Sequence, residues 1–245
     1  MKKLILFIVV TFSLMSTATA QSRAEELFKT YRFGLFLGPS INSLRPTSSL
    51  IDKYTISKGK GNIGFSFGIT ADYNINERYT IFSGIGLDWR GGQINAIHDS
   101  SAPASDYAKS ANVTYRQQYL TIPLGLKMMA TRIDKLKILA QTGFDLGILL
   151  SQRGDFVIMP NSGATVIGAK TKLSGYATGV PVNIGWYIGP GVEYDLNGKN
   201  AVFASILYRN GFVDATTPKN NNAGLKFSDG NIRSNSFALR VGYFF

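Results

Sequence analysis

Apolar and polar residues alternate with a period of two over most of this chain. In the stretch 63–75, "IGFSFGITADYNI", Ile63, Phe65 and Phe67 fall on one face of an extended chain, while small and polar residues fall on the other. Eight such segments, bounded by turn-forming residues, predict eight β-strands. The expected strands cover residues 31–41, 63–75, 80–91, 113–129, 137–150, 182–195, 201–211 and 235–245.

The connections between these strands alternate in length. They are short after the second, fourth and sixth strands ("NERY", "ATRIDKL" and "LNGKN"), and the last carries an Asn-Gly turn signal. They are long after the first, third, fifth and seventh, over about 42–62, 92–112, 151–181 and 212–234. The pattern predicts an all-β fold: an eight-stranded antiparallel up-and-down transmembrane β-barrel with four long loops at one end and short turns at the other.

The glycines indicate which face of the barrel looks outward. Gly64, Gly68, Gly185 and Gly189 all fall on the polar side of their strands. A water-facing surface would carry Lys, Glu and Thr, whereas the narrow lumen of eight strands needs small residues. We therefore expect the polar face inside and the apolar face against a bilayer. A soluble lipid-binding barrel has the reverse arrangement, and it would fractionate without detergent.

Charged residues on the inward face nearly cancel. Six basic side chains, Lys137 among them, face five acidic ones, Asp195 among them. This near balance indicates that salt bridges fill a closed lumen, and the less favoured interpretation is an ion or proton path. The expected lumen network consists of Arg32, Asp72, Asp88, Arg90, Lys127, Asp145, Glu193, Arg209 and Arg240.

Aromatic residues on the apolar face collect near the strand ends, as interfacial girdles do. The expected girdle consists of Tyr31, Tyr73, Trp89, Tyr194, Tyr208, Tyr243 and Phe245. The chain ends on the alternating stripe Phe237, Leu239, Val241, Tyr243 and Phe245. We interpret this stripe as the last lipid-facing strand, which closes the sheet against the first strand so that no edge remains.

The first residues have the features of an export signal. Lys2 and Lys3 precede an apolar run that is too short to span a bilayer, and Ala18-Thr19-Ala20 follows as a cleavage site. We expect a signal peptide over 1–20, a short periplasmic lead over 21–30 and the outer-membrane barrel over 31–245. Both termini would then be periplasmic and the long loops extracellular.

Charge and composition limit the expected partners. The net charge of +11 falls to +9 without Lys2 and Lys3, and no basic run exceeds two residues, so we expect no nucleic acid. Contact with outer-membrane lipid and lipopolysaccharide phosphates is the better interpretation of the basic balance. The chain has no cysteine, which excludes disulfides and thiolate metal sites.

The fourth expected strand also resembles a known family. Tyr119, Leu120, Ile122, Pro123, Leu124, Leu126 and Lys127 match the Tyr-Leu-x-Ile-Pro-Leu-x-Leu-Lys pattern of PorT-like outer-membrane β-barrel proteins of the Bacteroidota. The C-terminal stripe is similar to the signal read by the barrel-assembly machinery. The resemblance implies an outer-membrane barrel, a partner in that machinery and, for some members, a link to protein secretion.

Candidate catalytic chemistry is sparse. His98 is the single histidine, and the run His98-Asp99-Ser100-Ser101 suggests a triad, but neighbouring residues in a loop rarely reach one another correctly. We expect no catalytic residue, no resident metal and no cofactor, although loop carboxylates could hold a weakly bound calcium ion. The expected role is structural or surface-interacting, with secretion-system or surface partners. The alternatives are a narrow channel or secretion component, and a lipid-modifying enzyme that uses His98.

Overall fold

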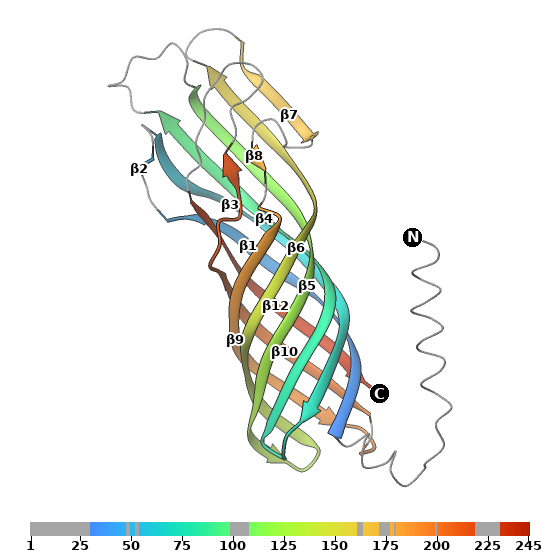
Figure 1. Cartoon of the computed structure of the whole chain (residues 1–245). Helices are drawn as coiled ribbons and strands as arrows, with labels where there is room; N and C mark the ends of the chain where they lie inside the picture. The colour runs from blue at the N-terminus through green and yellow to red at the C-terminus, as the bar shows by residue number, and fades with distance from the viewer. Residues whose placement is uncertain are drawn as a thin grey trace, which may run out of the picture.

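The computed structural model describes residues 30–47, 50–51, 54–98, 108–160, 164–171, 177–178, 180–198, 200–218 and 231–245. Eight long strands pair antiparallel in chain order, and β1 pairs with both β3 and β12, so the sheet closes on itself as a barrel (Figure 1). These strands are β1 (Tyr31–Pro46), β3 (Tyr54–Asn74), β4 (Tyr79–His98), β5 (Ala108–Ile133), β6 (Leu136–Pro160), β9 (Val182–Asp195), β10 (Ala201–Gly211) and β12 (Ile232–Phe244). The predicted all-β, eight-stranded, up-and-down fold is confirmed.

Four short strands add to this frame at the loop end. The strand β2 pairs with β3, β7 pairs with β6, and β8 and β11 form a separate two-stranded sheet. Their bounds are Leu50–Ile51, Val166–Thr171, Ala177–Thr178 and Thr217–Pro218. No helix in the described part of the chain is long and apolar enough to cross a membrane.

Side-chain exposure confirms the predicted orientation of the two faces. Ile63, Leu124 and Phe237 are 80%, 59% and 58% exposed on the outside, whereas Asp72 and Asp88 are each 1% exposed on the inside. An apolar belt therefore surrounds the barrel, and polar residues fill it. A protein surface of this kind is stable against hydrocarbon, because every backbone group is paired within the closed sheet.

The short turns lie together at the end of the barrel where β1 begins and β12 ends (Figure 1). The turn after β9 contains Gly198 at φ 77°, a backbone conformation that suits glycine, so the Asn-Gly turn signal is confirmed. In the turn between β5 and β6, Asp134 also adopts a positive φ of 52°. Close pairing of consecutive strands at this end follows from these tight connections.

The expected loop boundaries were wrong, because several strands continue far beyond the apolar belt. Four strands, β3, β4, β5 and β6, have 20 to 26 residues each and rise past the others at the loop end (Figure 1). We call their parts beyond the belt the loop-end extension; it consists of residues 54–61, 92–98, 108–118 and 151–160. Much of the first three stretches expected to be loops is therefore sheet.

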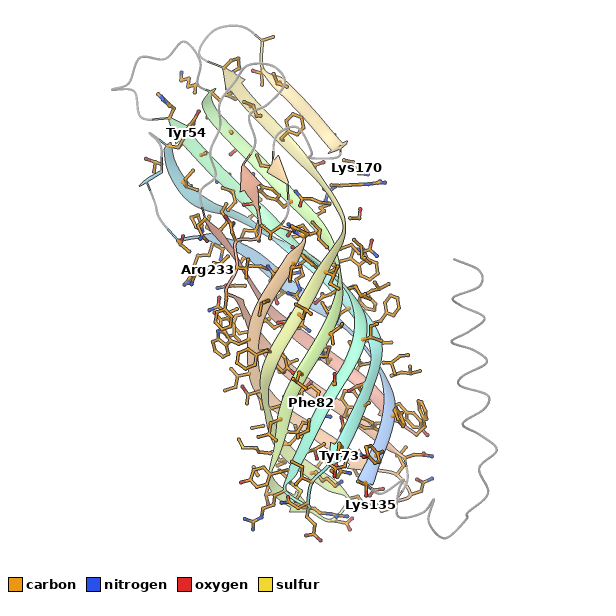
Figure 2. The ribbon with its side chains drawn as sticks, viewed as in Figure 1. Tyr54, Tyr73, Phe82, Lys135, Lys170 and Arg233 are labelled. Atoms are coloured by element: carbon orange, nitrogen blue, oxygen red, sulfur yellow. The ribbon has the colours of Figure 1, made fainter. Side chains whose placement is uncertain are left out.

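The loop-end extension has its own apolar core, which explains why the strands continue. Ile94, Ala111 and Val113 are fully buried there, and the hydroxyl of Tyr54, labelled at the loop end in Figure 2, donates to the carbonyl of Ala108 at 3.0 Å. The core consists of Leu44, Tyr54, Ile56, Ile94, Ala96, Ala108, Ala111, Val113, Tyr115, Phe156, Ile158, Ala215 and Ile232. Above the belt the sheet is thus packed like a water-soluble protein, apolar inside and polar outside.

Candidate functional site

The lumen is the candidate site, and the structure places all nine residues of the expected network inside it. Eight of them are buried, and Arg32, near the turn end, is half-buried. They divide into two separate groups of ion pairs and one isolated arginine. Each side chain points inward because it occupies the inward position of its strand, so the alternation itself positions the site.

The first group, which we call the loop-side ion cluster, consists of Asp88, Arg90, Asp145 and Arg209. One carboxylate oxygen of Asp88 accepts from Arg90 Nε at 2.9 Å and from Arg209 Nη1 at 2.5 Å. Arg90 Nη2 also donates to Asp145 at 2.5 Å. Two carboxylates and two guanidinium groups, contributed by β4, β6 and β10, therefore join opposite walls of the barrel.

The second group, the turn-side ion cluster, consists of Arg32, Asp72, Lys127, Lys137 and Glu193. Asp72 pairs with Lys127 at 2.7 Å and with Arg32 at 3.1 Å. Glu193 pairs with Arg32 at 2.5 Å and with Lys137 at 3.1 Å. The result is a chain of five alternating charges, three basic and two acidic, that crosses the lumen near the short turns. Asp195 lies nearer the mouth, where it accepts a hydrogen bond from the Gly198 backbone.

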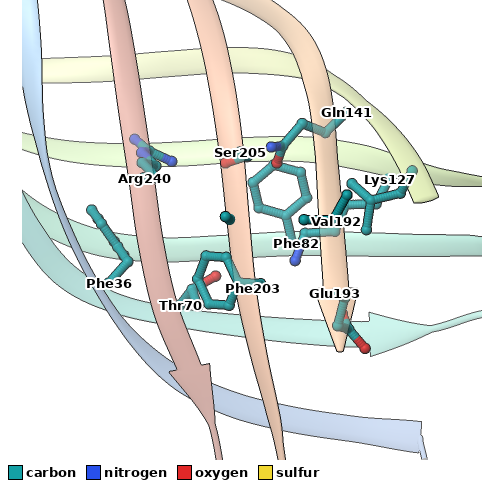
Figure 3. Close-up of a pocket in the computed structure, with 12 residues that line it drawn as sticks. Phe36, Thr70, Phe82, Lys127, Gln141, Val192, Glu193, Phe203, Ser205 and Arg240 are labelled. Atoms are coloured by element: carbon teal, nitrogen blue, oxygen red, sulfur yellow. The ribbon is translucent and has the colours of Figure 1, made fainter. Parts of the chain in front are cut away.

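Aromatic rings line the lumen beside Arg240 and beside Lys127 and Glu193 of the turn-side ion cluster (Figure 3). The ammonium of Lys127 lies 4.9 Å from the centroid of Phe82 and 4.8 Å from that of Phe244, both of which are buried. On the other side, the guanidinium of Arg240 lies 4.6 Å from the ring of Phe36. Cation–π contacts of this kind are attractive and strengthen when both partners are desolvated. They join the charged and aromatic layers into one packed filling.

Tyr187 is a lumen residue that sequence reasoning missed. Its side chain is fully buried, and it packs against Phe82 with ring centroids 6.1 Å apart. A Cβ added at Gly143 would lie 2.6 Å from the Tyr187 hydroxyl, so the glycine makes room for this ring. The signal was present in the sequence as an inward-facing tyrosine among inward-facing glycines, a large side chain that needs small neighbours.

Both ends of the lumen differ from its middle. The apolar core of the loop-end extension covers the loop end, beyond Gln117, whose amide donates to Gln152 and to the Ala215 carbonyl. At the turn end, a polar vestibule of about 610 Å³ reaches inward as far as Lys127 and Glu193. The lumen is therefore accessible at the turn end and filled above it.

The expected aromatic girdle lies on the outer surface. Trp89 stacks on Phe67 with ring centroids 5.8 Å apart, and Tyr208 contacts Phe237 at 5.1 Å on the loop-side edge of the belt. Near the turns, Tyr31 and Tyr73 lie 4.9 Å apart. Tyr194, Tyr243 and Phe245 are exposed there as well. The C-terminal stripe Phe237, Leu239, Val241, Tyr243 and Phe245 faces outward along β12 and its end.

Little in the described residues resembles a catalytic centre. His98 ends β4 and packs edge-on against Tyr54, with ring centroids 5.2 Å apart, while the Asp99, Ser100 and Ser101 of the suggested triad lie outside the described residues. No group of three or more His, Cys, Asp or Glu side chains in the described ranges could hold a metal ion. The expected signal peptide and the expected lead up to residue 29 also fall outside the part described.

A closed eight-stranded barrel with an apolar belt, aromatic edges and a polar, side-chain-filled lumen defines the outer-membrane class of β-barrels. Sequence comparison places the chain within that class. Residues 19–217 match the model of the outer membrane protein beta-barrel domain, and the chain belongs to this family. It is accordingly an outer-membrane protein. No curated protein matches the chain in sequence.

Solved structures of the same kind share the fold at low identity. The outer membrane protease OmpT of Escherichia coli is 11% identical, with a TM-score of 0.50 over 88% of this chain and 96% of that one. Neisserial surface protein A is 13% identical (TM-score 0.42, 86% and 95% covered). The attachment invasion locus protein Ail of Yersinia pestis is 11% identical (TM-score 0.36, 88% and 99%). These proteins include an enzyme, so the shared fold does not determine activity.

Proposed function

We propose that the protein is a non-enzymatic outer-membrane barrel with a sealed lumen and a structural or surface-interacting role. The observation that carries the proposal is the filling of the lumen by two ion clusters, a layer of rings and an apolar core at the loop end. A side-chain-filled barrel of eight strands leaves no continuous water path. Function then falls to the surfaces at the two ends.

The proposal includes an orientation and a route of export. The signal peptide over residues 1–20 directs the chain to the periplasm, and the C-terminal stripe is read by the barrel-assembly machinery. The short turns and both termini lie in the periplasm, while the loop-end extension stands outside the cell. Lipid and lipopolysaccharide surround the apolar belt, and surface or secretion-system partners bind the loop end.

The loop-end extension is the surface best suited to such a partner. Its rigid sheet has an apolar core, and its exterior is polar, with Arg116 and Asp155 forming an exposed ion pair at 2.7 Å. A β-strand crosses a bilayer with about 9–11 residues, and the shortest barrel strand, β10, already has 11. Residues beyond the belt are therefore not needed to span the bilayer. Their ordered packing supports a binding role.

The second candidate is a narrow channel or a component of a secretion apparatus. The vestibule of about 610 Å³ at the turn end favours it, because water enters the lumen there. The PorT-like pattern around Tyr119 supports the secretion role. In this function the ion clusters would have to separate and the apolar core would have to open.

Planar-bilayer recording on the refolded, full mature chain tests the sealed lumen. We expect no steady openings of defined size, with circular dichroism confirming that the inserted protein is folded. Reproducible conductance steps would favour the channel instead.

A second experiment tests the surface role by chemical crosslinking in native membranes. We expect Arg153→Glu, at an exposed site of the loop-end extension, to reduce capture of a bound partner. The same change at the exposed turn residue, Lys135→Glu, serves as the control and should leave capture intact. Equal capture by both variants would contradict a partner site at the loop end.

A further inference from the structure

The charges within the lumen do not balance once they are assigned to ion pairs. The loop-side ion cluster is neutral, with two arginines and two aspartates. The turn-side ion cluster has three basic side chains and two carboxylates, and Arg240 adds a further cation. Within these described groups six basic side chains meet four acidic ones. An uncompensated charge in a low-dielectric interior is strongly unfavourable, so the lumen favours an additional negative charge.

The excess is located at Arg240. Its side chain is 8% exposed, and it has no ion pair with any acidic group among the described residues. Asp88 and Asp145 interact with it electrostatically from the loop side, but their close contacts are with Arg90 and Arg209. The Nε atom of Arg240 is buried without a hydrogen-bond partner. By contrast, all three basic side chains of the turn-side ion cluster, Arg32, Lys127 and Lys137, line the vestibule, so its excess charge lies where the lumen is open.

A small void lies beside this arginine. It holds about 20 Å³, and its lining includes Arg240, Ser205, Gln141 and the rings of Phe36 and Phe82. Figure 3 shows Ser205 between Arg240 and Gln141, so that a guanidinium, a hydroxyl and an amide line the same space. We call this space the Arg240 void.

The carboxylate that borders the void is already neutralised. Glu193 accepts hydrogen bonds from Arg32 on both of its oxygens and from Lys137 on one. The neighbouring ammonium of Lys127 is likewise bound by both oxygens of Asp72. The strongest field that remains within the void is therefore the positive one of Arg240.

The size of the void suits a small ligand. A space of about 20 Å³ can hold a particle comparable with one water molecule, so we expect a single-atom anion in preference to a larger oxyanion. The void adjoins the vestibule at the turn end, because Lys127, Leu139 and Glu193 line both. An anion that enters from the turn end therefore does not have to cross the loop-side ion cluster.

We propose that the Arg240 void is a binding site for one halide ion, chloride under cellular conditions, held by the Arg240 guanidinium, the Ser205 hydroxyl and the Gln141 amide. The bound ion supplies the missing negative charge and couples the aromatic layer to both walls of the barrel. The site is a property of the folded lumen and is independent of any partner at the loop end.

Bromide provides a direct test on the unaltered chain. Crystals grown in sodium bromide should show an anomalous difference peak in the Arg240 void. Absence of a peak there, in crystals that show ordered side chains around the void, would overturn the proposal. Because no variant is used, the result does not depend on how a substitution folds.

Thermal unfolding in detergent micelles tests the energetic role. We expect a higher Tm in sodium chloride or bromide than in sodium gluconate of the same ionic strength, because gluconate is too large for the void. Arg240→Met should abolish this difference, Arg240→Lys should retain part of it, and Arg153→Met, which removes an exposed arginine, should retain all of it. Two results would show that the lumen does not bind halide. One is that the halide salts still raise the Tm of Arg240→Met above its value in gluconate; the other is that the unaltered chain has equal Tm values in all three salts.

Discussion

Single residues in the lumen act through shared contacts rather than isolated pairs. Asp88 is the clearest case, because one of its oxygens accepts from Arg90 and from Arg209, which lie on different strands. Removal of this carboxylate leaves the buried guanidinium of Arg209 without its ion-pair partner and leaves Arg90 with Asp145 alone. The cost of an unpaired buried charge is much larger than the net contribution of an exposed pair.

We therefore expect Asp88→Asn to lower the free energy of unfolding by about 3–5 kcal/mol. Denaturant titration of the refolded protein in lipid vesicles measures the change. The control is Asp155→Asn, which removes the same charge from the exposed pair with Arg116 and should cost no more than about 1 kcal/mol. Equal losses in the two variants would show that the loop-side ion cluster is not desolvated.

The close approach of neighbouring atoms to Gly143 leads to a second prediction about a single residue. A Cβ there would lie 2.2 Å from the Leu124 carbonyl oxygen and 2.6 Å from the Tyr187 hydroxyl, so Gly143→Ala should destabilise the barrel by about 1–3 kcal/mol. Gly147→Ala, on the same strand and the same face, is the control, because its nearest neighbour is Tyr119 Cδ1 at 3.2 Å. Urea midpoints that fall equally for both variants would contradict the tight approach at Gly143.

At the scale of the element, β4 shows how one strand serves two environments. Its inward positions change from Asp88 and Arg90 to Ile94 and Ala96, while its outward positions change from Leu87 and Trp89 to Gln93 and Asn95. The alternation continues without interruption, but its polarity reverses at the edge of the belt. Lipid surrounds the part of the strand within the belt, and water surrounds the part beyond it. The first part therefore buries its polar side chains, and the second part buries its apolar ones.

This reversal marks the limit of what the sequence predicted. The closure of β12 on β1, the inward face and most turn-end boundaries were predictable from period-two alternation. The exception is β5, which continues to Ile133, four residues beyond its expected end at Met129. The loop-end boundaries were not predictable, because a reversal of polarity looks like the end of a lipid-facing strand. On β6 a bulge adds to the difficulty: Leu150 is skipped in the pairing with β5, so the inward position passes from odd to even residues.

The sequence predicted which charged residues line the lumen, but not which of them form ion pairs with one another. Alternation assigns Arg32, Asp72 and Arg240 to the inside, but register between distant strands decides which carboxylate each cation meets. Arg32 and Glu193 are 161 residues apart in the chain and still pair. The isolation of Arg240 could only be seen once the other pairs were assigned.

The core of the loop-end extension makes a prediction at this scale. Ile94 is fully buried there, so Ile94→Ala should create a cavity that costs about 2–5 kcal/mol locally. Hydrogen exchange should increase in the extension and remain slow within the belt. Ile97→Ala, on the same strand at a site that is 59% exposed, is the matched control and should leave exchange unchanged. Similar exchange in the two variants would indicate that the extension has no core of its own.

At the scale of the whole molecule, two modes of packing share one sheet. The belt exposes large apolar side chains on every barrel strand, among them Leu35, Phe67, Leu124 and Phe144. A protein in water rarely exposes apolar patches of this extent, whereas a bilayer requires them. The family match and the closed sheet agree with this interpretation.

The belt predicts the effect of a charge placed in it. Leu124→Arg, near the middle of the bilayer, should lower the free energy of unfolding in lipid vesicles by about 2–4 kcal/mol. Thr114→Arg, at an outward position of the same strand beyond the belt, is the control and should cost little. A loss below about 0.5 kcal/mol for Leu124→Arg would show that this face does not contact hydrocarbon.

The most direct test of the central claim uses the two tryptophans of the chain, Trp89 and Trp186, which both occupy outward positions of the belt. Their fluorescence can be measured in vesicles of lipids with brominated acyl chains and, separately, with acrylamide in the water. If the apolar face contacts the bilayer, brominated lipid quenches most of the emission and acrylamide quenches little. Strong quenching by acrylamide, with no effect of the brominated chains, would contradict the account.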